Sequence, residues 1–113
     1  MVEYIQGQLP RSELLCQLAE EASELAQAAL KLHRAEDGTN PTTVTVEEAL
    51  RNLEEEVGDV LNALEVLEID VFAVWHDGGR LKKMRRWSER LEEAKENREM
   101  AAELFNQMQE CPF

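Results

Sequence analysis

The chain has 113 residues and a net charge of −12, with 24 acidic against 12 basic side chains. Its length suits a single domain, and a hydrophobic content of 43% is enough to build a core. The negative charge argues against binding to DNA, RNA or anionic membranes, because those partners are anionic themselves. Glycine and proline are scarce, at 5 and 3 residues, so the regular turns of a β-sandwich or barrel are missing and we expect an all-α fold.

A first long helix is predicted from Ser12, as its N-cap, to about His33. Its apolar stripe recurs every three or four residues and comprises Leu14, Leu18, Ala22, Leu25, Ala29 and Leu32. Residues 35–45 are polar and contain Gly38 and Pro41, which predicts an exposed loop after this helix.

A second helix is predicted to begin after Thr45, because Glu48 three residues later completes a capping box. Its stripe ends near Glu68 and comprises Leu50, Leu53, Val57, Val60, Leu61, Leu64 and Leu67. We expect these two helices to form an antiparallel hairpin joined by the exposed loop. Residues 69–76 are mostly apolar, and residues 77–79 indicate a break.

A third helix is predicted over about residues 80–107, with a basic first part: residues 80–90 carry a net charge of +5. Its apolar face is interrupted by Arg98 and comprises Leu81, Met84, Trp87, Leu91, Ala94, Ala101, Phe105 and Met108. Three stripes make a small bundle, so we expect a homodimer or homotetramer that completes a four-helix core.

We expect a cytoplasmic protein. No apolar stretch approaches the length that spans a membrane. The two cysteines, Cys16 and Cys111, have the spacing of neither a disulfide framework nor a metal site.

Two pairs of acids border the leucine stripes of the predicted hairpin. Glu21 and Glu24 are neighbours on the first helix, and Glu56 and Asp59 are neighbours on the second. If the hairpin brings the pairs together, a divalent cation is needed to offset the repulsion. Oxygen ligands without His or Cys favour Mg²⁺, with Mn²⁺ as a substitute. The alternative is that these acids are ordinary residues of solvated helix faces.

The pattern Glu20-Glu21-x-x-Glu24 followed by Glu56-x-x-Asp59 resembles the MazG-like branch of the all-α nucleoside triphosphate pyrophosphohydrolases. The resemblance covers roughly residues 14–67, with weaker support from the basic helix start, and implies one MazG-like domain over residues 1–113. One departure is the long spacing of 31 residues between Glu24 and Glu56, which the loop at 35–45 explains.

The resemblance implies Mg²⁺-dependent hydrolysis of a nucleoside triphosphate to monophosphate and pyrophosphate. Glu21, Glu24, Glu56 and Asp59 would be the metal ligands, and Glu20 would hold a second metal or orient water. All five acids are candidate catalytic residues. Candidate substrate-binding residues are Lys31, Asn62, Lys82, Lys83 and Arg86.

Two other classes of function compete with this one. One is a non-enzymatic acidic helical module for dimerisation or regulation, in which the acids only keep the protein soluble. A di-iron carboxylate protein needs Glu-x-x-His, but the residues three before His33 and His76 are Leu30 and Ala73, so this class is excluded.

Overall fold

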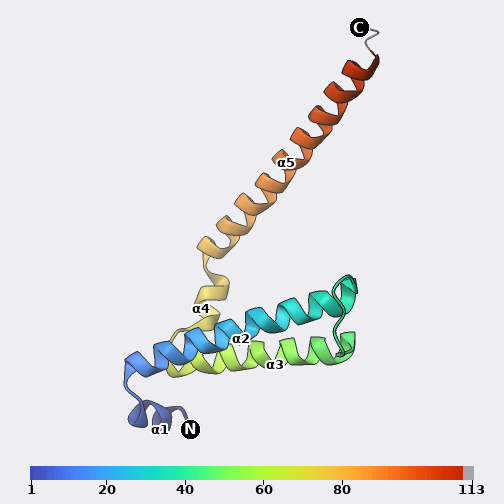
Figure 1. Ribbon diagram of the computed structural model, residues 1–113. Helices are drawn as coiled ribbons and strands as arrows, with labels where there is room; N and C mark the ends of the chain where they lie inside the picture. Colours follow the sequence, from blue (N-terminus) through green and yellow to red (C-terminus); the bar gives the residue numbers. More distant parts are fainter. Residues whose placement is uncertain (111–113) are drawn as a thin grey trace. The chain divides into compact units, whose positions relative to one another are not determined.

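The structure, a computed structural model, describes residues 1–110, and over these residues it is all-α, as predicted (Figure 1). Cys111 lies outside the described residues. The helices are α1 (Val2–Gln8), α2 (Arg11–Asp37), α3 (Val46–Val66), α4 (Val71–His76) and α5 (Gly78–Glu110). The chain divides into an N-terminal unit, Met1–Val71, and a C-terminal unit, Phe72–Phe113.

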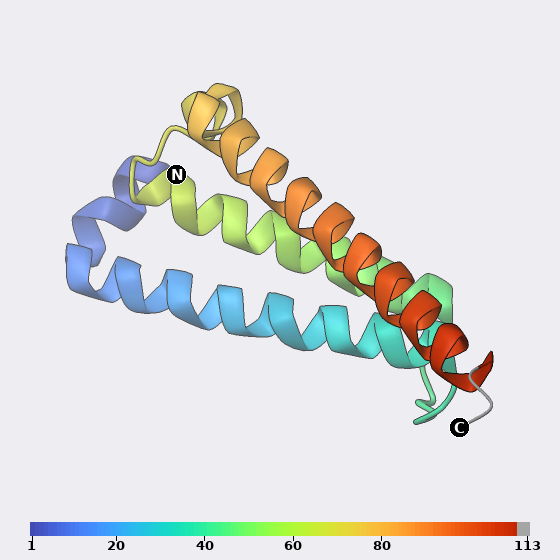
Figure 2. The same ribbon diagram turned by 90° about the horizontal axis from the view of Figure 1, so that it is seen from above.

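Helices α2 and α3 form the predicted antiparallel hairpin and lie side by side (Figures 1 and 2). Their facing positions are spaced alternately by three and four residues, as in a coiled coil. The least exposed apolar residues on this line are Leu14, Leu18, Leu25, Ala28 and Leu32 of α2 and Ala49, Leu53, Val60, Ala63 and Leu67 along α3 and its C-cap. We call this line of contact the hairpin seam.

The predicted stripes are wider than the hairpin seam. On α2, Ala28 is buried, whereas Ala22 and Ala29, which the periodicity placed on the inner face, are exposed. On α3, Leu50, Val57 and Leu61 are also exposed, by 43–45%. Two packed helices can bury only one edge of each apolar stripe, so the residues on the other edge stay exposed to solvent.

The start of α2 differs from the prediction. The N-cap is Pro10, not Ser12, because the Pro10 carbonyl accepts hydrogen bonds from the N–H groups of Glu13 and Leu14, at 2.9 and 3.2 Å. The helix also continues through residues 35–37, which we predicted to be loop. It ends at Gly38, whose φ of 73° is the left-handed conformation that glycine adopts without a steric penalty.

The start of α3 is as predicted. The Thr45 hydroxyl accepts a hydrogen bond from the Glu48 N–H at 3.2 Å, and the Glu48 carboxylate accepts one from the Thr45 N–H at 3.4 Å. These two bonds are the capping box, which fixes where the loop ends and therefore the register of α3 against α2.

Helix α1 was not predicted, and it packs against α3. The Gln6 side-chain amide donates a hydrogen bond to the Val66 carbonyl at 3.0 Å, so α1 caps the open end of the hairpin. A helix of 7 residues is too short to show two periods of an apolar pattern.

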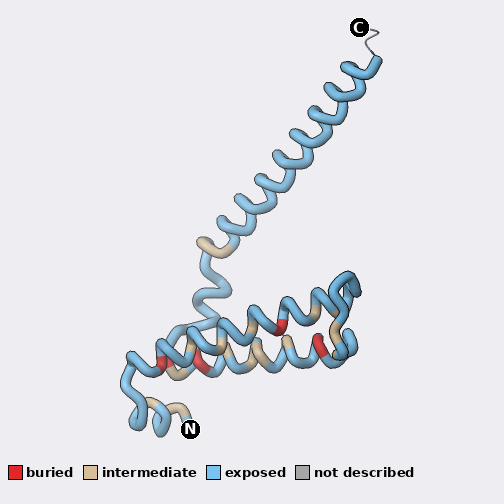
Figure 3. Tube along the Cα trace, viewed as in Figure 1, coloured by how far each residue is buried: buried red, intermediate tan, exposed pale blue. Residues whose placement is uncertain are grey.

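In the C-terminal unit, α5 begins at Gly78 and ends at Glu110, so it is longer than predicted and the break lies at Asp77. The Arg80 guanidinium joins the two helices: its Nε donates to the Trp75 carbonyl at 2.7 Å, and its carbon lies 4.2 Å from the Trp75 ring centre. Every residue from Leu81 to Glu110 is exposed (Figure 3). In the described part of the chain, no helix has the length and apolarity needed to cross a bilayer.

Candidate metal centre

Glu21, Glu24, Glu56 and Asp59 come together in the hairpin. Each offers one carboxylate oxygen, and these four oxygens all lie within 4.8 Å of one another. The two acids of each pair lie one helical turn apart on the same helix. Two neighbouring turns of α2 and two of α3 therefore supply the whole cluster. The antiparallel packing of two regular helices is therefore enough to build it.

The register of the hairpin explains why the acids meet. Glu21 lies seven residues before Ala28 on α2, and Glu56 lies seven residues after Ala49 on α3. An antiparallel register that places Ala28 against Ala49 therefore also places Glu21 against Glu56, two helical turns away. The two glutamates occupy a layer of the hairpin seam where apolar side chains would otherwise pack.

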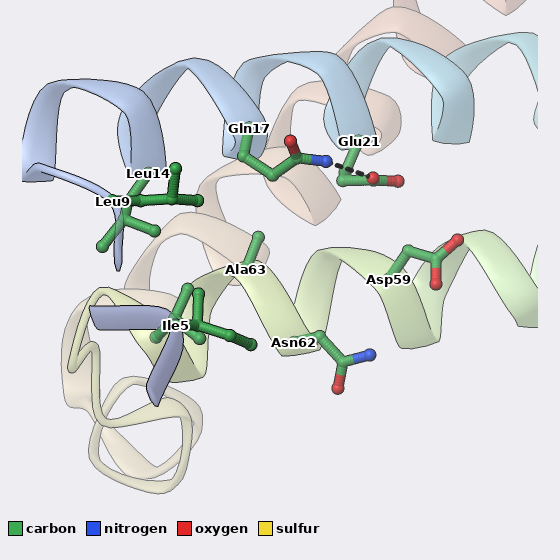
Figure 4. A pocket seen from close by; sticks show the side chains of 9 residues that line it. Ile5, Leu9, Leu14, Gln17, Glu21, Asp59, Asn62 and Ala63 are labelled. Atoms are coloured by element: carbon green, nitrogen blue, oxygen red, sulfur yellow. Dashed lines mark hydrogen bonds between the residues drawn. The ribbon is translucent and has the colours of Figure 1, made fainter. Parts of the chain in front are cut away.

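This position deprives both glutamates of water. Glu21 and Glu56 are half-buried, and the Oε2 atom of each is buried without a hydrogen-bond partner. The second oxygen of Glu21 accepts a hydrogen bond from the Gln17 side-chain amide at 2.8 Å (Figure 4). A buried carboxylate oxygen without a donor is costly, and a cation between the two oxygens would remove that cost.

The crowding also shows in the pKa of Glu24. That pKa is raised above its ordinary value, first by the negative charge of Glu21, then by that of Glu56, with smaller effects from desolvation and from hydrogen bonds to the same two side chains. Glu24 and Asp59 are themselves exposed. Two partly desolvated and two exposed carboxylates thus share one small volume.

The donor set fits a hard divalent cation. All four groups are carboxylates, and no His or Cys belongs to the cluster. Oxygen-only ligands suit Mg²⁺ and Mn²⁺, whereas zinc sites usually include nitrogen or sulfur. Such an ion would also give a partner to the two buried oxygens of Glu21 and Glu56 that lack a hydrogen bond.

Hollows lie on both sides of the cluster. One, of about 370 Å³, has a polar wall that includes Gln17, Glu21, Asp59 and Asn62 and an apolar end formed by Ile5, Leu9 and Leu14 (Figure 4). The other, of about 330 Å³, is lined by Glu24, Gln27, Ala28, Lys31, Asn52 and Glu56. Lys31 and Asn62, both predicted to bind substrate, therefore lie in different hollows.

Some residues of these hollows were not predicted. Gln17 and Asn52 each stand four residues before a seam glutamate, Glu21 and Glu56 respectively, and so lie one turn away on the same helix face. That i−4 spacing of an amide and an acid is the signal that could have identified them.

The remaining predicted residues lie outside the cluster. Glu20 is exposed on α2 and does not contribute to the four converging oxygens. Lys82, Lys83 and Arg86 are exposed on α5, in the C-terminal unit. Their contact with a substrate stays a prediction.

Comparison with known proteins found no family model, no curated protein and no solved structure that matches this chain.

Proposed function

We propose that this chain is a Mg²⁺-dependent nucleoside triphosphate pyrophosphohydrolase. It would cleave a ribo- or deoxyribonucleoside triphosphate between the α- and β-phosphates, releasing monophosphate and pyrophosphate, as a housekeeping step for the cytoplasmic nucleotide pool. The observation that carries the proposal is the cluster of four carboxylates with two orphaned oxygens in the hairpin seam. The spacing of these acids, which resembles that of the MazG-like enzymes, supports it.

In this proposal, Glu21, Glu24, Glu56 and Asp59 hold Mg²⁺. An ion held there would neutralise charge on the phosphate oxygens and lower the pKa of the attacking water. Glu56 and Glu21 lie in the hairpin seam, so packing fixes their positions before the substrate arrives. Glu20 is exposed one position before Glu21 and can accept the proton of a water molecule or orient it.

The hollows beside the cluster would receive the two ends of the substrate. The apolar end formed by Ile5 and Leu9 suits a base, and Asn62 on the polar wall can hydrogen-bond a sugar or base. On the other side, Lys31 can neutralise a phosphate. Lys82, Lys83 and Arg86 would add positive charge, from the same chain or from a second copy.

The exposed edge of the hairpin supports an oligomer. Leu50, Val57 and Leu61 are apolar and nearly half exposed, one to two turns apart along α3. A second hairpin packed on this edge would bury them and complete a four-helix core, giving a homodimer or homotetramer.

The same exposed edge favours the alternative function, a non-enzymatic dimerisation or regulatory module. That function needs the apolar edge but not the acids. It therefore predicts that association survives when Glu21 and Glu56 are replaced by glutamine and that Mg²⁺ has no effect on the protein.

The experiment that decides is a product analysis. Purified protein is incubated with each ribo- and deoxyribonucleoside triphosphate and Mg²⁺, and pyrophosphate and orthophosphate are measured separately. We expect equal amounts of monophosphate and pyrophosphate from at least one nucleotide, lost when Mg²⁺ is chelated. Orthophosphate alone, or no product from any nucleotide, would count against the proposal.

A further inference from the structure

Helix α5 presents an apolar face that nothing in the described part of its own unit covers. Its 33 residues form one continuous helix, and the large side chains Trp87, Leu91 and Phe105 are each about 60% exposed. Most of the stability of a helix in a protein comes from packing of its apolar face. A helix this long with such a face is therefore expected to have a packing partner.

The spacing of that face is the spacing of a two-helix coiled coil. Counting from Met84, positions alternate by three and four residues for almost four heptads. The series is Met84, Trp87, Leu91, Ala94, Arg98, Ala101, Phe105 and Met108, in which Arg98 is the single charged member. We call this series the α5 seam, and a shallow depression on the helix surface follows its first part.

The distribution of charge along α5 favours antiparallel over parallel pairing with α5 of a second copy. Residues 80–90 carry a net charge of +5, and residues 91–110 carry −4. A parallel pair would place the basic segments against each other and would bring Arg90 beside Lys95 of the second copy at two places. An antiparallel pair places each basic segment alongside the acidic C-terminal part of the other helix; Glu103 and Glu110 lie on the outer face there, so the attraction is between the net charges of the segments and not between ion pairs across the seam. The antiparallel pair leaves one like-charged contact, between the two Lys95 side chains, which Glu92 and Glu99 on the same helix offset.

The apolar layers also match in the antiparallel direction. With Glu96 opposite itself, the bulky Trp87 lies opposite Phe105 of the second copy, and Met84 lies opposite Met108. Arg98 lies opposite the small Ala94, which leaves room for the guanidinium to reach solvent. The antiparallel pair thus accommodates the one charged residue of the α5 seam. A parallel pair would instead place Arg98 against Arg98 of the second copy.

We propose that α5 pairs with α5 of a second copy of this chain as an antiparallel coiled coil centred on Glu96. The contact is isologous, with the same seam on both chains, so it closes on itself. It uses α5 alone and requires neither Mg²⁺ nor substrate, so its failure would leave the proposed hydrolysis standing.

Interchain distances between spin labels test this proposal in the full chain. Lys82, Glu89, Glu96 and Glu103 are exposed and share the helix face opposite the α5 seam. Each is changed to cysteine singly in a Cys16→Ser, Cys111→Ser background and labelled. At 1.5 Å per residue, the axial offset between equivalent labels is about 42, 21, 0 and 21 Å, respectively. The shortest interchain distance should therefore fall at Glu96 and rise on both sides. Four equal distances would show a parallel pair, and no interchain distance at Glu96 would show that α5 does not pair; either result overturns the proposal.

A matched pair of variants identifies the surface. Leu91→Gln with Phe105→Gln removes two seam residues from each chain, and we expect it to weaken α5 pairing by about 100-fold or more and to abolish the short distance at Glu96. Met100→Gln is the control, since Met100 is 61% exposed but lies outside the α5 seam, and it should leave that distance unchanged. If the double variant keeps the short distance, the helices do not meet through this face and the proposal is wrong.

Discussion

The hairpin and α5 carry the same kind of heptad pattern and use it differently. The hairpin seam is packed, yet one of its layers consists of Glu21 and Glu56, whose inner oxygens have no partner. The α5 seam is apolar apart from Arg98, yet it is exposed throughout. A charged layer inside a packed seam costs stability, and this cost is the reason why we propose a metal ion there. An exposed apolar seam is the reason why we propose that α5 pairs with a second copy.

The largest expected effect concerns activity. Glu56→Gln and Asp59→Asn each remove one cluster charge with little change in volume, so we expect kcat/KM for the nucleotide to fall by about 100-fold or more, while the circular dichroism spectrum is unchanged. Glu54→Gln is the matched control, because Glu54 is exposed on the same helix outside the cluster. Full activity in both cluster variants would place the chemistry elsewhere.

Filling the charged layer of the hairpin seam with leucine should make it resemble an ordinary coiled coil. We expect Glu21→Leu with Glu56→Leu to raise the free energy of unfolding of the metal-free protein by about 1–4 kcal/mol, since repulsion and two orphaned oxygens are replaced by apolar packing. Urea denaturation measures this. The control, Glu20→Leu with Glu54→Leu, changes exposed acids and should give no such gain. A destabilised seam variant would contradict our description of that layer.

The capping box gives a smaller effect that tests the register of the hairpin. Thr45→Ala removes the hydroxyl that accepts the Glu48 N–H, and we expect a loss of about 1 kcal/mol in urea denaturation. Thr43→Ala, at an exposed loop position just before it, is the comparison variant. Equal losses in the two variants would mean that the cap does not fix the start of α3.

The smallest effect is a pH dependence without metal. The pKa of Glu24 is raised in the folded state, chiefly by Glu21 and then by Glu56, so the folded protein holds this proton more tightly than the unfolded chain. The resulting stabilisation is complete below the ordinary glutamate pKa and is lost as the pH rises through the raised pKa of Glu24. Across that window, acidification should stabilise the metal-free protein. Glu24→Gln should flatten this part of the plot of urea midpoint against pH, whereas Glu20→Gln should not. Identical plots for the wild-type protein and both variants would show that Glu21 and Glu56 do not raise the pKa of Glu24.

Much of the hairpin could be predicted from the sequence because its signals are local. The capping box at Thr45 involves only four consecutive residues. The i, i+3 spacing of the acids determines which of them share a helix face. The acids met as predicted because they border stripes that both helices present to each other.

Other features depend on tertiary packing and could not be predicted. The apolar stripe of α2 has Ala28 on one edge and Ala22 and Ala29 on the other. Only the position of α3 decides that Ala28 is the one that becomes buried. Ser12 is a better N-cap by residue type, but the Pro10 carbonyl takes the first hydrogen bonds of α2. The i−4 spacing could have identified Gln17 and Asn52, but the hollow that each residue lines depends on how α2 packs against α3.

Metal binding by the cluster is the most direct test of the central claim. Free Mn²⁺ gives an electron paramagnetic resonance signal that is lost on binding, so a titration can be followed in the absence of nucleotide and then reversed with Mg²⁺. We predict saturable binding of Mn²⁺ to the wild-type protein, displacement by Mg²⁺, and affinity at least about tenfold weaker in Glu21→Gln with Glu56→Gln. Equal affinity in the double variant, or no binding by the wild-type protein, would show that these four carboxylates do not form a metal site.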